Sequence, residues 1–136
     1  MPDVPPVVID TNLFVAAVFN PGGDAARVLA AVRAGTPRIV WDEPTRQEAE
    51  RVIRATPPLS GTDLSDLFRP DGRYDGPTQP EAFDSIPDPA DRKFAALAAA
   101  TGAVLLTNDR HLLNGRPHLG VVALTPGEFV RRTWPQ

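Results

Sequence analysis

Acidic residues stand at two points where a short apolar segment ends, and these residues are the best suited to chemistry. Val7-Val8-Ile9 leads directly into Asp10, and a second apolar run ends at Thr107, two residues before Asp109. Apolar runs of this length are typical of buried parallel strands. In open α/β sheets, sites form at the carboxyl ends of the strands. The pattern therefore predicts that both acids lie at one edge of a sheet, although capping of the next helix is the more usual role for either acid alone.

A third acid lies on the edge of an apolar helix face. The sequence predicts a helix over 43–55 whose apolar stripe contains Ala49, Val52 and Ile53, and Glu48 precedes Val52 by four residues. A carboxylate that faces inward needs a partner. That partner is either a metal ion or a nearby arginine at the sheet edge, and the spacing alone does not separate the two.

A fourth acid, Asp91, stands in the first turn of a helix expected over 92–101. Asp88 and Pro89 precede it and form a capping-box-like helix start, so Asp91 also suits the helix dipole. Helix capping therefore explains Asp91 as well as metal binding does. Asp88 is its rival as the third acid of a metal site.

The chemistry that would use such a set of acids is phosphodiester hydrolysis. Carboxylate oxygens suit hard cations such as Mg²⁺ or Mn²⁺. One or two ions held by three or four acids can activate water and neutralise the charge on the phosphate, so that no protein nucleophile is needed.

The elements expected to position these acids alternate between strands and helices. Strands are expected over 7–9, 38–41, 103–107 and 120–124, and helices over 13–19, 24–33 with Asp24 as N-cap, 43–55, 92–101 and 128–132. A Pro/Gly-rich excursion at about 56–80 interrupts this order, with one short helix expected over 63–68. The alternation predicts a single domain over 1–136. Its fold class is α/β, with a Rossmann-like, mostly parallel sheet flanked by helices on both faces.

Composition excludes several other kinds of site. The chain of 136 residues has no Cys, which excludes disulfides, zinc–thiolate sites and thiol catalysis, and its only histidines are His111 and His118. It has no apolar run long enough for a membrane span and no signal-peptide pattern, so a cytoplasmic location is expected. The net charge of −3 argues against binding nucleic acid by bulk charge alone. It does not exclude nucleic acid, because four acids committed to metal would leave the other charges nearly balanced.

The order of these segments resembles that of the PIN-domain nucleases, the family that includes the VapC-type toxins. The resemblance rests on segments spread along nearly the whole chain: 7–12, Glu48 within 43–52, 88–98, 105–113 and 124–129. It implies a Rossmann-like sheet and an acidic pocket that binds Mg²⁺ or Mn²⁺. The residues that match the four acids of the family are Asp10, Glu48, Asp91 and Asp109. Asn12 and Thr107 match polar residues that orient ligands or water.

The leading hypothesis is an endoribonuclease that requires Mg²⁺ or Mn²⁺ and hydrolyses RNA as the toxin of a type II toxin–antitoxin pair. The resemblance also implies a homodimer, and the hypothesis that the protein is a toxin implies an antitoxin partner. Five basic residues adjoin the acids in sequence and are candidate substrate contacts, although each also suits a solvated surface: Arg46, Arg92, Lys93, Arg110 and His111.

Three alternative functions compete with this hypothesis. A PIN nuclease of RNA processing that is not a toxin would carry the same acids. A non-catalytic RNA- or protein-binding domain that keeps the fold would lack some of them, and all four are present. A haloacid-dehalogenase-type phosphatase ranks lowest, because it needs a second Asp where Asn12 stands and a suitably placed Lys, and Lys93 is the only lysine.

Overall fold

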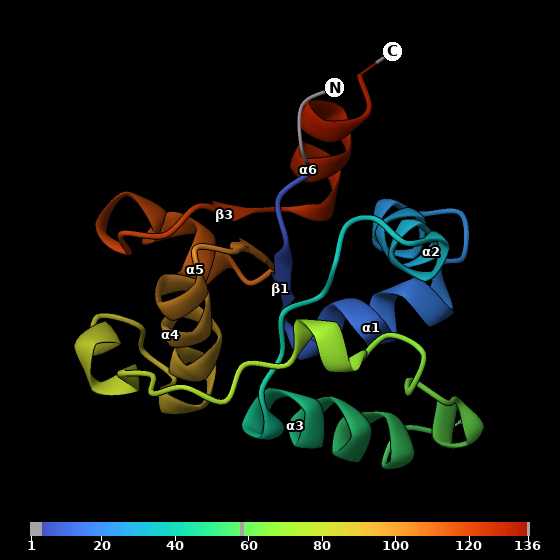
Figure 1. The fold of residues 1–136 in the computed structure, drawn as a ribbon, viewed down its shortest axis with the longest axis horizontal. Helices are drawn as coiled ribbons and strands as arrows, with labels where there is room; N and C mark the ends of the chain where they lie inside the picture. The colour runs from blue at the N-terminus through green and yellow to red at the C-terminus, as the bar shows by residue number, and fades with distance from the viewer. Residues whose placement is uncertain (1–3, 58, 136) are drawn as a thin grey trace.

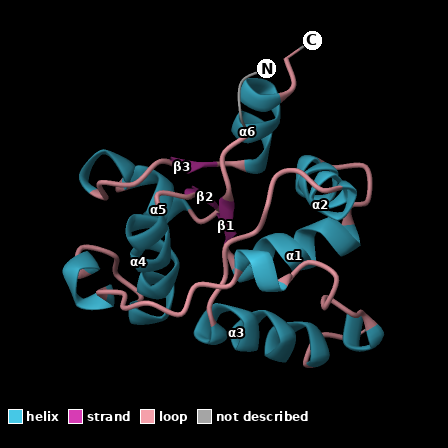
Figure 2. Cartoon of the chain, viewed as in Figure 1, coloured by secondary structure: helices cyan, strands magenta, loops and turns pink. Residues whose placement is uncertain are grey.

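Three short parallel strands form the centre of the fold (Figure 2). In the computed structural model, which describes residues 4–57 and 59–135, they are β1 (Val7–Ile9), β2 (Val104–Leu106) and β3 (Ala123–Leu124). Their order in the sheet is β1-β2-β3, and the register aligns Val8 with Leu105 and Leu105 with Ala123. Their carboxyl ends therefore lie along one edge, as predicted.

Helices cover both faces of this sheet, which confirms the predicted α/β fold class. They are α1 (Thr11–Phe19), α2 (Asp24–Ala34), α3 (Glu43–Arg54), α4 (Arg92–Thr101), α5 (Arg110–Asn114) and α6 (Pro126–Thr133). In Figure 1, α1, α2 and α3 lie to one side of the strands, and α4 and α5 lie to the other.

The alternation of side chains along β1 explains why the whole segment is apolar. Val7 and Ile9 belong to a core cluster with side chains of α1, α2, α3 and α6, whereas Val8 belongs to a second cluster with Phe94 and Leu97 of α4. Full burial of one such aliphatic side chain stabilises the fold by about 1.5–3 kcal/mol. A polar residue on either face of β1 would lose that term, so the strand cannot show the polar–apolar alternation of a half-exposed strand.

Two capping boxes fix the starts of helices that border the sheet. At α3, the Asp42 side chain accepts a hydrogen bond from the backbone N–H of Thr45, and the Thr45 side chain accepts one in return from Asp42. At α6, Thr125 and Glu128 exchange the same pair of bonds. Asp42 is the N-cap of α3, and Glu48 lies about one and two-thirds turns further along this helix.

The strand predicted over 38–41 is not formed. Ile39 pairs with Val7 and Trp41 pairs with Arg73, each as a single parallel bridge, so the segment is extended but bonds to different neighbours on either side. Gly72 lies close against this segment, since a Cβ added there would lie 1.9 Å from the carbonyl oxygen of Ile39.

The helix predicted over 63–68 is also wrong, because this part of the excursion forms turns. Asp63 accepts a hydrogen bond from the Ser65 backbone, an arrangement that competes with helix. Short 3₁₀ helices lie instead at Leu59–Gly61, Pro70–Gly72 and Pro80–Phe83. Leu59, Leu64 and Leu67 are buried in the same cluster as Val7, so the excursion belongs to the core.

Other predicted boundaries shift by a few residues. The strands predicted over 103–107 and 120–124 shorten to β2 and β3, and α1, α3 and α6 each differ from their predicted ends. The N-cap of α2 is Gly23, and Asp24 is its first helical residue. The helix α5 was not predicted at all. Among the described residues, no helix is long and apolar enough to cross a membrane.

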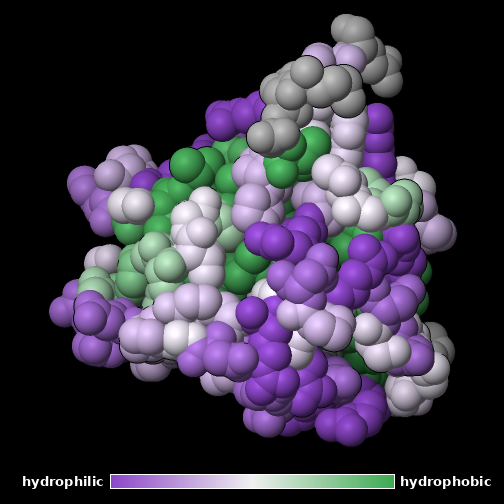
Figure 3. All heavy atoms as spheres, viewed as in Figure 1, coloured by the Kyte–Doolittle hydropathy of each residue, from purple (hydrophilic) through white to green (hydrophobic). Residues whose placement is uncertain are grey.

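Hydrophilic residues cover the part of the surface over α3 in the view of Figure 3, and hydrophobic residues gather beside β3, α4 and α5. The acids that the sequence predicts as a site come from the edge where β1 and β2 end, from helix α3 and from the turn that precedes α4.

Candidate active site

The carboxylate of Asp10 is buried at the end of β1 and held by a hydroxyl from the end of β2. Asp10 is 5% exposed and Thr107 is 0% exposed. The Thr107 hydroxyl donates a hydrogen bond of 2.7 Å to Asp10 Oδ2. The strands fix both residues, because the Asp10 N–H donates to Leu106 O and the Thr107 N–H donates to Leu124 O, each at 3.0 Å. The two strand ends predicted to meet do so through this bond.

Asp109 continues the same network and also caps a helix. Its backbone N–H donates to the Thr107 hydroxyl oxygen at 2.9 Å. Its Oδ1 accepts from the backbone N–H groups of His111 and Leu112 at 2.8 and 3.1 Å, which caps α5. Both capping bonds fall on Oδ1, so the cap leaves Oδ2 of Asp109 for another ligand. Capping and a functional role are therefore compatible in this residue.

Glu48 reaches from α3 and has a partner at each carboxylate oxygen. Its Oε2 accepts a hydrogen bond of 2.5 Å from the hydroxyl of Thr11, the first residue of α1. Its Oε1 accepts one of 2.6 Å from the ammonium of Lys93 on α4. The partner expected from a protein side chain was an arginine, and it is this lysine instead. The role of Thr11 was not predicted, although the residue follows Asp10 directly.

The structure separates the roles of Asp88 and Asp91. Asp88 Oδ1 accepts from the Ala90 N–H at 2.9 Å and caps the 3₁₀ turn Pro89–Asp91. Asp91 makes no side-chain capping bond to α4, although it stands at the N-cap position of that helix. The capping role that the sequence allowed for either residue is therefore taken by Asp88, and Asp91 is free to face the other acids.

Four other acids lie close enough to Asp91 to affect its pKa. Partial burial, with the nearby carboxylates of Asp10, Asp109, Asp88 and Glu48, raises the pKa of Asp91 from 3.8 to about 6. Each of these charges is close enough to disfavour a negative charge on Asp91. The structure thus brings all four predicted acids, with Asp88, into one electrostatic neighbourhood.

Burial also raises the pKa of Asp10 above its ordinary value. The hydrogen bonds from the Thr107 hydroxyl and from the backbone N–H of Asn12 oppose this rise, and the charges of Asp109 and Glu48 add to it. Asn12 was predicted to orient ligands through its side chain. In the structure that side chain is exposed, and its backbone amide is the group that contacts Asp10.

The chemistry of these donors fits a hard divalent cation. The set offers carboxylate oxygens whose ionised forms are disfavoured by burial and by mutual repulsion, and a positive charge placed among them would stabilise the ionised forms of Asp10 and Asp91. Within residues 4–57 and 59–135, no three acidic or histidine side chains are already arranged as a metal-binding group. Asp10, Glu48 and Asp109 each bond to a separate protein partner instead.

The predicted substrate contacts divide into engaged and exposed residues. Arg46 pairs with Glu43 and Glu50 and stacks over Trp41. Arg92 donates to the carbonyl oxygens of Ile86 and Asp84, and Lys93 bonds to Glu48. Arg110 and His111 are exposed at the start of α5, next to Asp109. Only the last two present free surface beside the acids.

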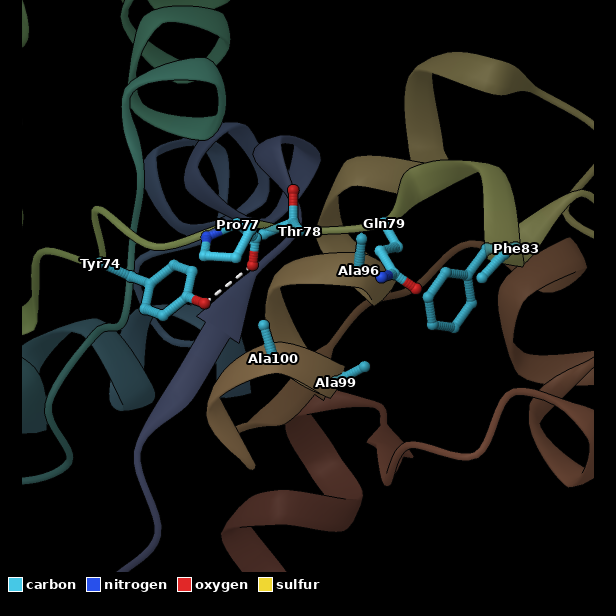
Figure 4. Close-up of a pocket in the computed structure, with 9 residues that line it drawn as sticks. Tyr74, Pro77, Thr78, Gln79, Phe83, Ala96, Ala99 and Ala100 are labelled. Carbon is cyan, nitrogen blue, oxygen red and sulfur yellow. Dashed lines mark hydrogen bonds between the residues drawn. The ribbon is translucent and has the colours of Figure 1, made fainter.

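A pocket of about 400 Å³ lies elsewhere, between the exposed side of α4 and the segment 74–83 (Figure 4). Tyr74, Phe83, Ala96 and Ala100 are among its lining residues, and none of the four acids is. A second hollow of about 410 Å³ runs between α1, α2 and α6 and is lined by Asn108, the neighbour of Asp109. None of the four acids lines this second hollow either.

A parallel α/β sheet with acids at the carboxyl ends of its strands belongs to the class of α/β proteins that bind ligands at that edge. Comparison with protein families identifies one member of this class: the PIN domain matches residues 6–111, which include all four acids. The chain therefore belongs to the PIN-domain family, whose members are in general nucleases. No curated protein and no solved structure matched the chain in the corresponding comparisons.

Proposed function

We propose that this protein is an endoribonuclease that requires Mg²⁺ or Mn²⁺. The observation that carries the proposal is the position of Asp10. This carboxylate is almost fully buried, is held by Thr107 at the end of the sheet, and is repelled by Asp109 and Glu48. A buried acid among other acids costs stability, so its presence favours a role that needs negative charge at this point.

Four carboxylates would hold the cation. Asp10, Asp91 and Asp109 would bind it directly, and Glu48 would bind it directly or through water. A divalent cation, when bound, supplies positive charge that stabilises the transferring phosphate and promotes ionisation of the attacking water. The Thr107 hydroxyl keeps Asp10 in place, and the exposed side chains of Arg110 and His111, next to Asp109 in sequence, would contact phosphates of the RNA.

The proposal is tested by cleavage of RNA oligonucleotides with Mn²⁺ or Mg²⁺, beside a DNA oligonucleotide of the same sequence. We expect RNA to be cut internally by wild type, and neither by Asp10→Asn nor by wild type in EDTA. Ser85→Ala on the exposed surface is a suitable control that keeps activity. Cutting without metal, or equal cutting by Asp10→Asn, would overturn the mechanism, and preferential cutting of DNA would overturn the choice of substrate.

The proposal extends to a toxin whose activity an antitoxin partner restrains. Expression in a bacterial host should then arrest growth, and Asp109→Asn should relieve the arrest. Growth unaffected by wild type would remove the toxin function and leave the nuclease in RNA processing. The predicted homodimer is tested separately by light scattering of the purified protein.

A further inference from the structure

The only lysine of the chain lies inside the acidic site. Of the 14 basic residues besides histidine, all except Lys93 are arginines. The Lys93 ammonium lies 2.6 Å from Glu48 Oε1 and 2.7 Å from the carbonyl oxygen of Ala90. The Lys93 side chain is 22% exposed and that of Glu48 is 16% exposed. Two acceptors on different elements thus fix the position of this ammonium group.

The contact with Lys93 completes the partners of Glu48. Thr11 donates to one carboxylate oxygen and Lys93 to the other, so Glu48 is satisfied without any metal ion. Among the described residues, Asp91 makes no capping bond with its carboxylate, and burial together with the surrounding acids raises its pKa. The protein therefore supplies one internal cation to a group of four acids, and that cation is bonded to Glu48.

We propose that Lys93 competes with the divalent cation for Glu48. In the metal-free protein its ammonium neutralises Glu48, and on loading the ammonium gives up Oε1. This inference rests on the proposed metal dependence of the site. It makes Lys93 a positioning residue that sets the metal concentration at which the site fills, rather than a residue that acts on RNA.

A neighbouring arginine provides a matched control. Arg92 carries the same charge on the same turn of α4, but its guanidinium donates to the backbone carbonyl oxygens of Ile86 and Asp84. Replacing Arg92 with Gln removes a positive charge close to the site and leaves Glu48 bonded to Lys93. The comparison separates direct competition from a general change in the local field.

The first test measures Mn²⁺ binding by calorimetry to wild type, Lys93→Gln and Arg92→Gln, each checked for folding by circular dichroism. We expect Lys93→Gln to bind Mn²⁺ at least about 10-fold more tightly than wild type, because loss of one charge-assisted contact is worth that ratio. Arg92→Gln should stay within about 3-fold. Equal affinity of Lys93→Gln and wild type, or an equal gain in Arg92→Gln, would overturn the inference. Absence of Mn²⁺ binding in all three proteins would instead overturn the proposed function.

The second test uses the uniqueness of this lysine. Protein labelled with ¹⁵N-lysine gives one side-chain ammonium signal, which reports Lys93 directly. Titration with diamagnetic Mg²⁺ should shift or broaden this signal with the midpoint of metal binding, and Glu48→Gln should produce a similar change without metal. A signal that saturating Mg²⁺ leaves unchanged would show that Lys93 keeps Glu48 in the loaded site and would refute competition.

Discussion

Replacing Thr107 with valine tests whether the hydroxyl at the end of β2 holds the site together. The side chain is fully buried, and valine has nearly the same shape. The hydroxyl donates to Asp10 Oδ2 at 2.7 Å and accepts from the Asp109 N–H at 2.9 Å. The substitution therefore removes two hydrogen bonds while leaving the volume of the core almost unchanged.

The magnitude follows from the two partners that are left behind. A hydrogen bond to a charged group contributes about 1.5–3 kcal/mol, and one between neutral groups contributes about 0.5–1.5 kcal/mol. Asp10 is 5% exposed and cannot turn to water for a replacement. We expect Thr107→Val to lower the free energy of unfolding by about 2–4 kcal/mol at neutral pH. Thr107→Ser keeps the hydroxyl and loses one methyl group, so it should cost about 1 kcal/mol.

The pH dependence distinguishes this cause from a packing defect. The Thr107 hydroxyl stabilises the ionised form of Asp10, so its loss raises the pKa of Asp10 further. The cost of Thr107→Val should be complete at high pH and should shrink as the pH falls through that raised pKa. Urea unfolding of wild type and Thr107→Val in EDTA at several pH values measures this difference in the free energy of unfolding. A cost equal to that of Thr107→Ser, or one that does not vary with pH, would refute the reasoning.

Three further predictions concern the acids and the excursion. The pKa of Asp91 is raised from 3.8 to about 6, so the folded chain binds more protons than the unfolded chain between these values. The free energy of unfolding of the metal-free protein should therefore fall as the pH rises from 3.8 to about 6. Urea unfolding of Asp91→Asn should show a smaller fall over the same pH range. Asp10→Asn removes a buried charge, so the metal-free protein should be as stable as wild type or more stable by about 1 kcal/mol, while RNA cleavage falls at least about 100-fold. Gly72→Ala would place a Cβ 1.9 Å from Ile39 O and should destabilise the chain by about 2 kcal/mol or more in thermal unfolding, whereas Gly61→Ala meets nothing within 4 Å and serves as its control.

The parts of the fold that the sequence predicts are those with a strong local signal. The buried strands β1 and β2 are apolar on both faces, and α3 begins at a capping residue, so each was located to within one or two residues. The segment 38–41 has the same apolar character but forms only single bridges. Within this segment, Trp41 pairs with Arg73, which lies in a Pro/Gly-rich stretch with no strand pattern. Local sequence therefore could not reveal that the pairing stops after one residue.

The sequence indicated the acids and Thr107, but it did not indicate the side chains that bond to Glu48. Strand ends pointed to Asp10 and Asp109, and the helix face pointed to Glu48. The hydroxyl of Thr11 and the ammonium of Lys93 meet Glu48 only because α1, α3 and α4 pack at one edge of the sheet. Such contacts join residues 37 and 45 positions apart, and no periodicity in the sequence encodes them.

Asp88 and Asp91 lie in one turn, and their hydrogen bonds show which of them caps a helix start and which does not. Both residues suit a helix start, and only the hydrogen bonds decide: Asp88 accepts from the Ala90 N–H, and Asp91 makes no cap. A capping acid is stabilised by the backbone that it bonds, whereas the ionised form of Asp91, which burial and neighbouring acids disfavour, would be stabilised by a nearby cation. The same distinction applies within Asp109, where Oδ1 bonds to α5 and Oδ2 lies outside the cap. In the proposed site, the Asp91 carboxylate and Oδ2 of Asp109 are thus not used in helix capping, whereas Glu48 would have to exchange its contact with Lys93 to bind a cation through Oε1.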